Sequence, residues 1–200
     1  MPITTSDTRA PAPRSARVIR FTFFFLGAAL GFGAALGLAA AFGLAAALGL
    51  PYAFASHFAP QMLDEALAIY RREFKPSEQL AEPYVICGFN IFAADNDQEA
   101  EYLASSMMQS FVALRTGNPG KLPPPVEAYR EGLPPQAQAM MAQIMQGSAV
   151  GAADAVKQGV GKFIERTGAD ELIISGSIFD QSARERSYEI AANVRELVAA

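Results

Sequence analysis

The chain has 200 residues, of which 51% are hydrophobic and 18% charged, with one Cys, one His and a net charge of −4. This length suits one domain and is shorter than the roughly 250 residues of a barrel with eight strand–helix units. A single cysteine excludes an intramolecular disulfide framework, and Cys87 and His57 are together too few for a zinc site. The negative charge and the lack of a basic stripe argue against nucleic acid as a partner.

Residues 1–20 differ from the rest of the chain because they carry four arginines against one aspartate. They are rich in Pro, Ser and Thr and hold few large apolar groups. Such a segment buries too little apolar surface to offset the cost of ordering it. We therefore predict a disordered basic arm over 1–20, which leaves the remaining residues distinctly acidic.

A repeat follows in residues 21–47, within a stretch from Phe21 to Leu63 that contains no charged residue. Read in sixes from Ala28, the sequence runs AALGFG, AALGLA, AAFGLA and AALGLP, with the glycines six residues apart. We predict an apolar, Ala/Gly-rich helical segment in front of the folded domain.

Several functions are open for this repeat. An apolar run longer than about 20 residues can cross a bilayer, and the preceding arginines suit a cytoplasmic flank, so a membrane anchor at 21–50 is one interpretation. A cleavable signal peptide is disfavoured because the run exceeds the usual h-region of about 7 to 15 residues. A β-helix is disfavoured because so few Ala-Gly repeats cannot fill a core. Low-complexity sequence with no selected function is the remaining interpretation.

Beyond Pro51 the composition becomes that of an ordinary α/β domain. The apolar and aromatic run at 51–58 predicts a buried strand, and the apolar spacing over 61–74 predicts a helix. Residues 83–95 are apolar on both faces, as in a strand of a parallel sheet. A helix is expected from about 97 to 115, capped by the polar residues just before it.

The second half of the domain continues this alternation. A long Pro-rich loop covers 116–136, and helical segments are expected at 140–145 and 153–166. The run at 171–179 predicts a third buried strand, and 181–198 predicts a terminal helix. Strands that alternate with helices imply an α/β fold whose three strands are parallel.

Few residues suggest chemistry of their own, because no phosphate loop, dinucleotide fingerprint or nucleophile elbow is present. His57 ends its predicted strand, where it could contact a ligand or only pack and hydrogen-bond. Asn90 lies inside an apolar strand and needs a partner, which could be the backbone or a cofactor. Cys87 is expected to be a buried, inert thiol. The lack of a self-contained triad is typical of enzymes whose cofactor carries the chemistry.

Over residues 48–200 the chain resembles the C-terminal part of the bacterial luciferase-like flavin monooxygenases. The resemblance runs without large gaps over about three quarters of the chain, which is more specific than one short motif. It is carried by LGLPYAFASHFAP (48–60), IYRREFKPSEQL (69–80), PYVICGFNIFAAD (83–95), GKLPPP (120–125) and TGADELIISGSIFDQSARERSYEIAANV (167–194).

This resemblance implies a parallel (β/α)8 TIM barrel, here a partial one whose three strands are the last of the barrel. It also implies a cytoplasmic enzyme that oxidises a small organic substrate with reduced FMN and O2, the reduced flavin coming from a flavin reductase. Ser56, His57 and Asn90 are the candidate groups near the flavin. Whether the chain forms a homo-oligomer is left open.

Two departures from the family bear on these expectations. The family's first strands have no counterpart here, and its Leu-Gly-Ser-Ser turn, which holds the flavin phosphate, is replaced by Gly, Ala, Leu and Phe alone over 27–49. We therefore expect weak flavin binding by a shortened chain, and an inactive barrel fragment is the alternative. The last hexad, AALGLP, matches the family, so the three hexads before it can be explained as tandem copies or as the product of an altered reading frame.

Overall fold

The structure is a computed structural model that describes residues 43–198. The predicted basic arm at 1–20 and residues 21–42 of the apolar repeat lie outside the described residues, so those predictions stay untested. Residues 43–47 are helical and lead through a turn into the first strand. Within 43–198, no helix has both the length and the apolar character that a membrane crossing needs.

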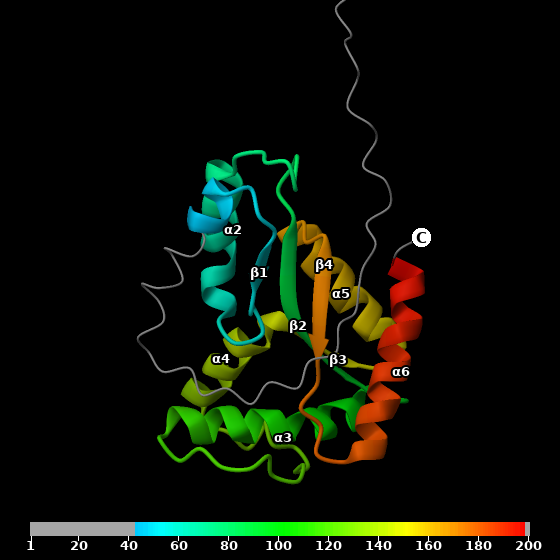
Figure 1. Cartoon of the computed structure of the whole chain (residues 1–200). Coiled ribbons are helices and arrows are strands. Elements are labelled where there is room, and N and C mark those ends of the chain that lie inside the picture. The colour runs from blue at the N-terminus through cyan, green and yellow to red at the C-terminus, as the bar shows by residue number, and fades with distance from the viewer. Residues whose placement is uncertain (1–42, 199–200) are drawn as a thin grey trace, which may run out of the picture.

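Strands and helices alternate along the described chain, as the sequence predicts (Figure 1). In chain order the elements are β1 (Tyr52–Phe54), η1 (Pro60–Met62), α2 (Leu63–Glu73), β2 (Val85–Ala93), α3 (Asp97–Arg115), α4 (Pro135–Ile144), η2 (Met145–Gly147), β3 (Ser148–Gly151), α5 (Ala153–Thr167), β4 (Glu171–Ser175) and α6 (Gln181–Val198).

The strand predictions need three corrections. A fourth strand, β3, was not predicted, because its four residues are too few to show a period. The predicted strand at 51–58 ends at Phe54, where the amide of Ser56 donates to the carbonyl of Phe54 at 2.9 Å and turns the chain. The predicted strand at 171–179 ends at Ser175, and Gly176 begins the connection to α6.

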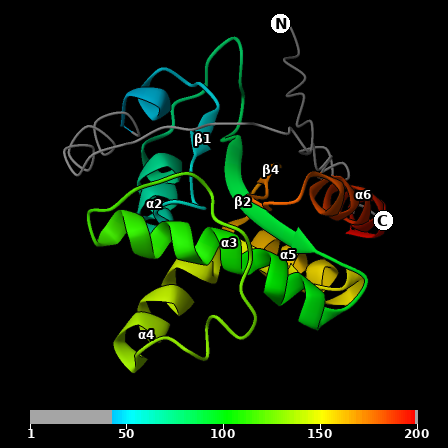
Figure 2. The same ribbon diagram turned by 90° about the horizontal axis from the view of Figure 1, so that it is seen from below.

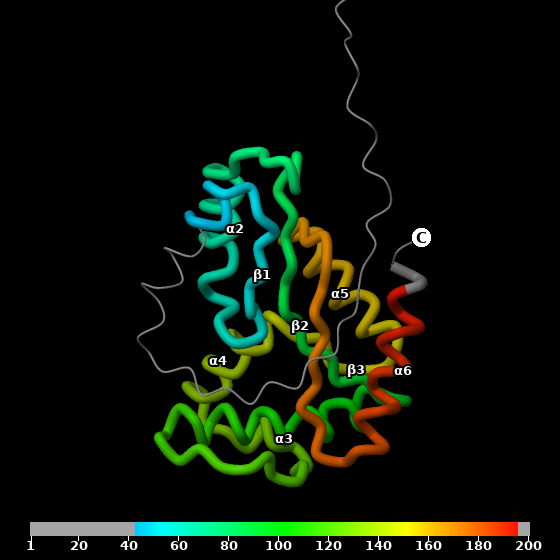
Figure 3. The backbone as a smooth tube through the Cα atoms, in the orientation of Figure 1, coloured from blue at the N-terminus to red at the C-terminus, as the bar shows by residue number. Residues whose placement is uncertain are grey.

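The four strands form one parallel sheet in which β2 pairs with every other strand. The start of β2 pairs with β1, its middle with β4 and its end with β3. Figure 3 traces β2 between β1 and β4. The registers place Ala53 beside Ile86, and Asn90 beside both Ser148 and Ser175. Because side chains alternate between faces along a strand, these registers assign each residue to one face of the sheet.

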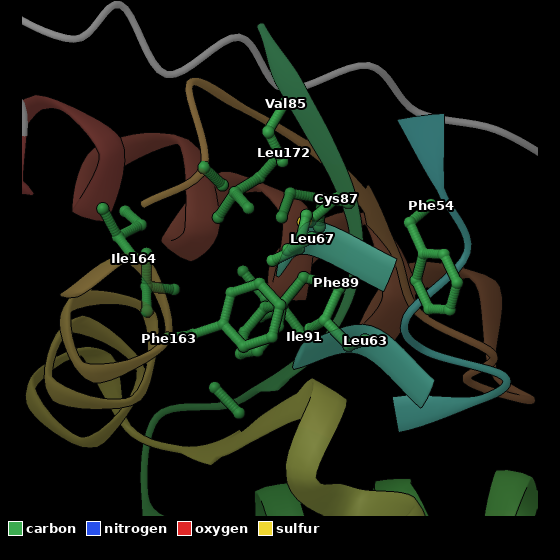
Figure 4. Close-up of a cluster of buried hydrophobic side chains, with 14 of the residues drawn as sticks. Phe54, Leu63, Leu67, Val85, Cys87, Phe89, Ile91, Phe163, Ile164 and Leu172 are labelled. Atoms are coloured by element: carbon green, nitrogen blue, oxygen red, sulfur yellow. The ribbon is translucent and has the colours of Figure 1, made fainter. Parts of the chain in front are cut away.

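One face of the sheet carries the main hydrophobic core. Odd-numbered residues of β2 point toward α2, α5 and α6, and the ring of Phe89 packs at a tilt against that of Phe163 of α5, with centroids 4.6 Å apart. Figure 4 shows part of this cluster, in which labelled side chains of α2, β2, α5 and β4 gather in one apolar volume. Full burial of each large apolar side chain is worth about 1.5 to 3 kcal/mol, so this face holds the sheet to its helices.

The opposite face is covered much less, and we call it the open face. Helices α3 and α4 cover it only near Phe92 and Val150, where α3 lies across the end of β2 (Figure 2). Ile86 and Ile173 are left half-buried. The open face comprises Ala53, Ile86, Gly88, Asn90, Ser148, Glu171, Ile173 and Ser175.

Two adjacent serines of α3 differ in how their hydroxyl groups are used, and they predict opposite effects on stability. Ser106 is fully buried and its Oγ has no hydrogen-bond partner, whereas the Oγ of Ser105 donates to the carbonyl of Tyr102 and accepts from the amide of Val126. Ser106→Ala should raise the free energy of unfolding by about 1 kcal/mol, because it removes an unpaired buried polar group. Ser105→Ala should lower it by a similar amount. Urea denaturation measures both, and a loss of stability in Ser106→Ala would contradict this interpretation.

Candidate functional site

The candidate site lies where the turn after β1 packs against the middle of β2. Ser56 is completely buried, and its Oγ donates to the carbonyl of Gly88 at 2.6 Å. Gly147, which ends η2 just before β3, packs closely against the same turn, since a Cβ on Gly147 would come within 2.8 Å of the Ser56 carbonyl oxygen. Ser56 therefore ties this turn to the central strand, and Gly147 leaves room for the turn to approach η2 closely.

The same turn places the imidazole of His57 directly over Gly88. A Cβ at position 88 would lie 2.6 Å from Cε1 of His57 and even nearer to its Nδ1, closer than any real side chain can approach. Glycine at this position is therefore what allows the imidazole to lie on the strand. Gly88 belongs to the open face, so His57 covers the middle of that face.

Burial governs the chemistry of His57. The Nδ1 atom is buried and has no hydrogen-bond partner, and desolvation lowers the pKa of the imidazole from 6.5 to about 4. The ring is thus neutral at pH 7. It lies 4.4 Å from the ring of Phe58, which is 43% exposed and in turn 6.3 Å from Phe111 of α3. A neutral imidazole therefore stands beside a partly exposed aromatic surface.

Asn90 lies two residues beyond Gly88 on the same face, roughly 6.6 Å along the strand. It is 6% exposed, and its partners are two serines: Nδ2 donates to Oγ of Ser148 at 3.3 Å, and Oδ1 accepts from Oγ of Ser175 at 2.7 Å. The hydrogen-bond partners that the sequence analysis required for Asn90 are thus side chains of the neighbouring strands β3 and β4, and not backbone groups. Each polar atom of the amide keeps capacity for one more hydrogen bond.

Cys87 faces the main hydrophobic core on the other side of the sheet, with the side chain of Ser56 beside its thiol. It is buried, and desolvation raises the pKa of its thiol to about 12, so the thiol stays protonated and unreactive at neutral pH. The sequence analysis missed Gly88, Ser148 and Ser175 as members of the site. An isolated glycine inside a strand can signal a close approach, so Gly88 was detectable, but neither serine carries such a signal.

Comparison with known proteins shows what the chain is similar to. No family model matches the sequence. The chain is 47% identical to the luciferase-like monooxygenase of Escherichia coli (strain K12) over 146 residues, which are 73% of this chain and 44% of that protein. It is 41% identical to the uncharacterized protein YvbT of Bacillus subtilis (strain 168) over 144 residues, which are 72% of this chain and 43% of that protein.

Two solved structures have folds similar to that of this chain. The apo form of MsnO8 superimposes with a TM-score of 0.63 at 28% identity, over 80% of this chain and 49% of that one. The monooxygenase RslO1 from Streptomyces bottropensis matches with a TM-score of 0.52 at 17% identity, over 81% and 46%, and this likeness supports the fold alone. The parallel sheet is therefore a partial TIM barrel of the luciferase-like type. The chain is similar to a part of the luciferase-like monooxygenases and spans less than half the length of the curated relatives that it matches.

Proposed function

We propose that this chain supplies one wall of a flavin-dependent monooxygenase site, with His57 and Asn90 on the open face directed at the flavin or the substrate. The observation that carries this proposal is the imidazole held over Gly88, two residues from the amide of Asn90, on the less covered face of a luciferase-like sheet. The complete site would use reduced FMN and O2 to oxidise a small organic substrate. A separate flavin reductase would supply the reduced flavin.

The residues present suit the ring system of a flavin, which has one apolar and one polar end. Phe58 offers an exposed aromatic surface, while His57 and Asn90 offer hydrogen-bonding groups nearby. Buried polar atoms without a partner are exceptional in folded proteins, and Nδ1 of His57 is one. A ligand at this face would meet both kinds of surface.

The described residues do not suit the flavin phosphate. Helix N-termini are the usual anion sites in such folds, but side chains already occupy those near the carboxyl ends of the strands. Asn96 accepts from the amide of Glu99 in the first turn of α3, and Asp180 accepts from the amide of Ala183 in that of α6. Asp97 accepts from the amide just before α5. We infer that residues 43–198 do not hold the phosphate of a bound FMN.

When bound, reduced flavin supplies the electrons that let oxygen react with the substrate. The role of this chain is to position the ring and to exclude water from it. His57 is neutral at pH 7, so it can donate one hydrogen bond and accept another. Ser56 is a positioning residue, because its bond to the Gly88 carbonyl fixes the turn that carries the imidazole. Asn90 is held rigid by two serines, which leaves its amide oriented for a further partner.

Flavin titration tests this proposal on the full chain. We expect weak binding with the same Kd for FMN and riboflavin, within about twofold, because the described residues make no phosphate site. His57→Ala and Asn90→Ala should each raise Kd about tenfold, as expected for one lost hydrogen bond of about 1.4 kcal/mol. Flavin fluorescence quenching gives these constants.

A matched control is Arg72→Ala, which removes a side chain that is 66% exposed on α2 and should leave Kd unchanged. The proposal fails if His57→Ala and Asn90→Ala bind flavin as tightly as the unmodified chain. Binding of FMN more than tenfold tighter than riboflavin would instead contradict the inferred absence of a phosphate site.

A further inference from the structure

The connection between α3 and α4, residues 116–134, is tied to the helix that precedes it. Figure 2 shows it running back along α3 before α4 begins. Side chains four residues apart share one face of a helix, and three such side chains of α3 hold the connection. Gln109 Nε2 donates to the Pro124 carbonyl at 2.9 Å, the Val126 amide donates to Ser105 Oγ at 2.7 Å, and Arg130 forms an ion pair with Glu101, whose Nε–Oε1 distance is 2.8 Å.

The two halves of this connection are held in different ways. The first half contains three consecutive prolines at 123–125, whose fixed φ angles limit its conformations, and uncharged hydrogen bonds anchor it. We call residues 127–131 the latch. Among the described residues, the ion pair of Arg130 with Glu101 is the only polar contact between the latch and α3.

A cavity of about 290 Å³ lies between the latch and α3. All five residues of the latch line it, and the fully buried Met108 lines it from the side of α3. Well-packed proteins contain few voids larger than a water molecule. The latch therefore crosses a hollow, where it gains less from packing than a segment in full contact with its neighbours.

Two features of the latch oppose its position on α3. Ala128 has a φ of 48°, in the left-handed region that a residue with a Cβ adopts only at a cost in free energy. The second feature is electrostatic. Burial raises the pKa of Glu101, Arg130 lowers it and Glu131 raises it again, with a net increase. Among the described residues that line the cavity, Arg130 is the one cation beside three carboxylates, those of Glu101, Glu127 and Glu131.

We propose that the latch is a movable lid, which opens and closes over the cavity while the rest of the domain stays folded, and that Arg130 holds it closed. Opening breaks the ion pair, returns both charged groups to water and lets Ala128 leave the left-handed conformation. The segment up to Val126 stays on α3, because its own hydrogen bonds do not involve the latch. This motion requires no flavin, so it can be tested separately from the proposed function.

Thiol labelling of the full chain by iodoacetamide tests the proposal. Cys87 is the only cysteine and is buried in the main core, so it reports unfolding of the domain. Met108→Cys adds a thiol on the floor of the cavity. We expect the thiol at position 108 to react at least tenfold faster than Cys87, because local opening costs less free energy than global unfolding. Low concentrations of urea should speed the labelling of Cys87 much more than that of position 108, because global unfolding exposes more surface.

Variants of the ion pair test the role of Arg130. Arg130→Gln should raise the labelling rate at position 108 about tenfold, because a charge-assisted contact is lost and Glu101 is left beside Glu131. Adding Glu101→Gln should reverse most of this increase, because it removes the carboxylate that the arginine neutralised. The matched control is Arg72→Gln, which breaks an exposed ion pair of α2 at the same distance of 2.8 Å and should leave the rate unchanged.

Proteolysis of the chain with Met108 intact gives a second measurement, which decides the outcome if Met108→Cys does not fold. A glutamate-specific protease should cut after Glu127 or Glu131 about tenfold faster in Arg130→Gln than in Arg72→Gln, because the cleaved segment must leave α3. The proposal is overturned if position 108 and Cys87 react at equal rates with the same dependence on urea. It is equally overturned if Arg130→Gln and Arg72→Gln are labelled or cut alike.

Discussion

Gly88→Ala is expected to lower the free energy of unfolding by about 3 kcal/mol and to displace the imidazole of His57. The added methyl group would overlap the ring, so the ring must shift although the backbone of its turn is tied to Gly88 by Ser56 and approaches Gly147 closely. Overpacking of this kind costs about 1 to 3 kcal/mol in well-packed proteins, and the upper end applies where the neighbour is fixed. Urea denaturation of the two proteins measures the difference.

Two further variants separate this clash from a general effect of replacing glycine. Gly161→Ala on α5 adds a methyl group that meets nothing within 4 Å, so it should raise stability by up to about 1 kcal/mol. In a His57→Ala background the cost of Gly88→Ala should fall by about 2 kcal/mol, because the clashing ring is gone. An unchanged cost in that background would show that the imidazole is not what position 88 accommodates.

Stability should fall as the pH drops from about 6.5 toward 4, by up to about 3 kcal/mol from His57 alone. The pKa of this imidazole is about 4 in the folded chain and 6.5 without burial. Between these values the unfolded chain binds a proton that the folded chain does not, so acid favours unfolding. Above pH 6.5 the imidazole is neutral in both states, and its contribution is constant.

His57 is the only histidine, which makes the comparison with His57→Gln direct. The difference in unfolding free energy between the two proteins, measured at pH 7 and at pH 5, should change by about 2 kcal/mol. The carboxylates contribute equally to the pH dependence of unfolding in both proteins, so their contribution cancels in the difference. An unchanged difference, or an imidazole that titrates near pH 6.5 in the folded chain, would contradict burial of Nδ1.

The sequence predicted the helices well because their signals are local. Asn96 caps α3 through the amide of Glu99, and apolar residues at helical spacing set the extent of α3 and α6, so both agree with the predicted ranges. Gly168, just beyond the predicted helix at 153–166, adopts the left-handed conformation at the end of α5, with φ of 58°. Such signals can be recognised within a few residues of the chain.

The site itself depends on contacts between distant segments, and the sequence could predict only its members. His57 and Asn90 were recognisable as polar or titratable residues at strand positions. That His57 lies over Gly88, and that Asn90 bonds to Ser148 and Ser175, follows from strand register, which a single sequence does not specify. Strand β3 was missed for a related reason, since it is defined by its pairing with β2 more than by its own four residues.

His57 faces the proposed flavin site, and NMR of this single imidazole tests that placement most directly. Riboflavin is added to the full chain at pH 7, and the chemical shifts of the one imidazole are followed, with the Arg72→Ala protein as the control. We predict a saturable change in the His57 signals at the same flavin concentration that quenches flavin fluorescence. Flavin binding that leaves the His57 signals unchanged would contradict the account.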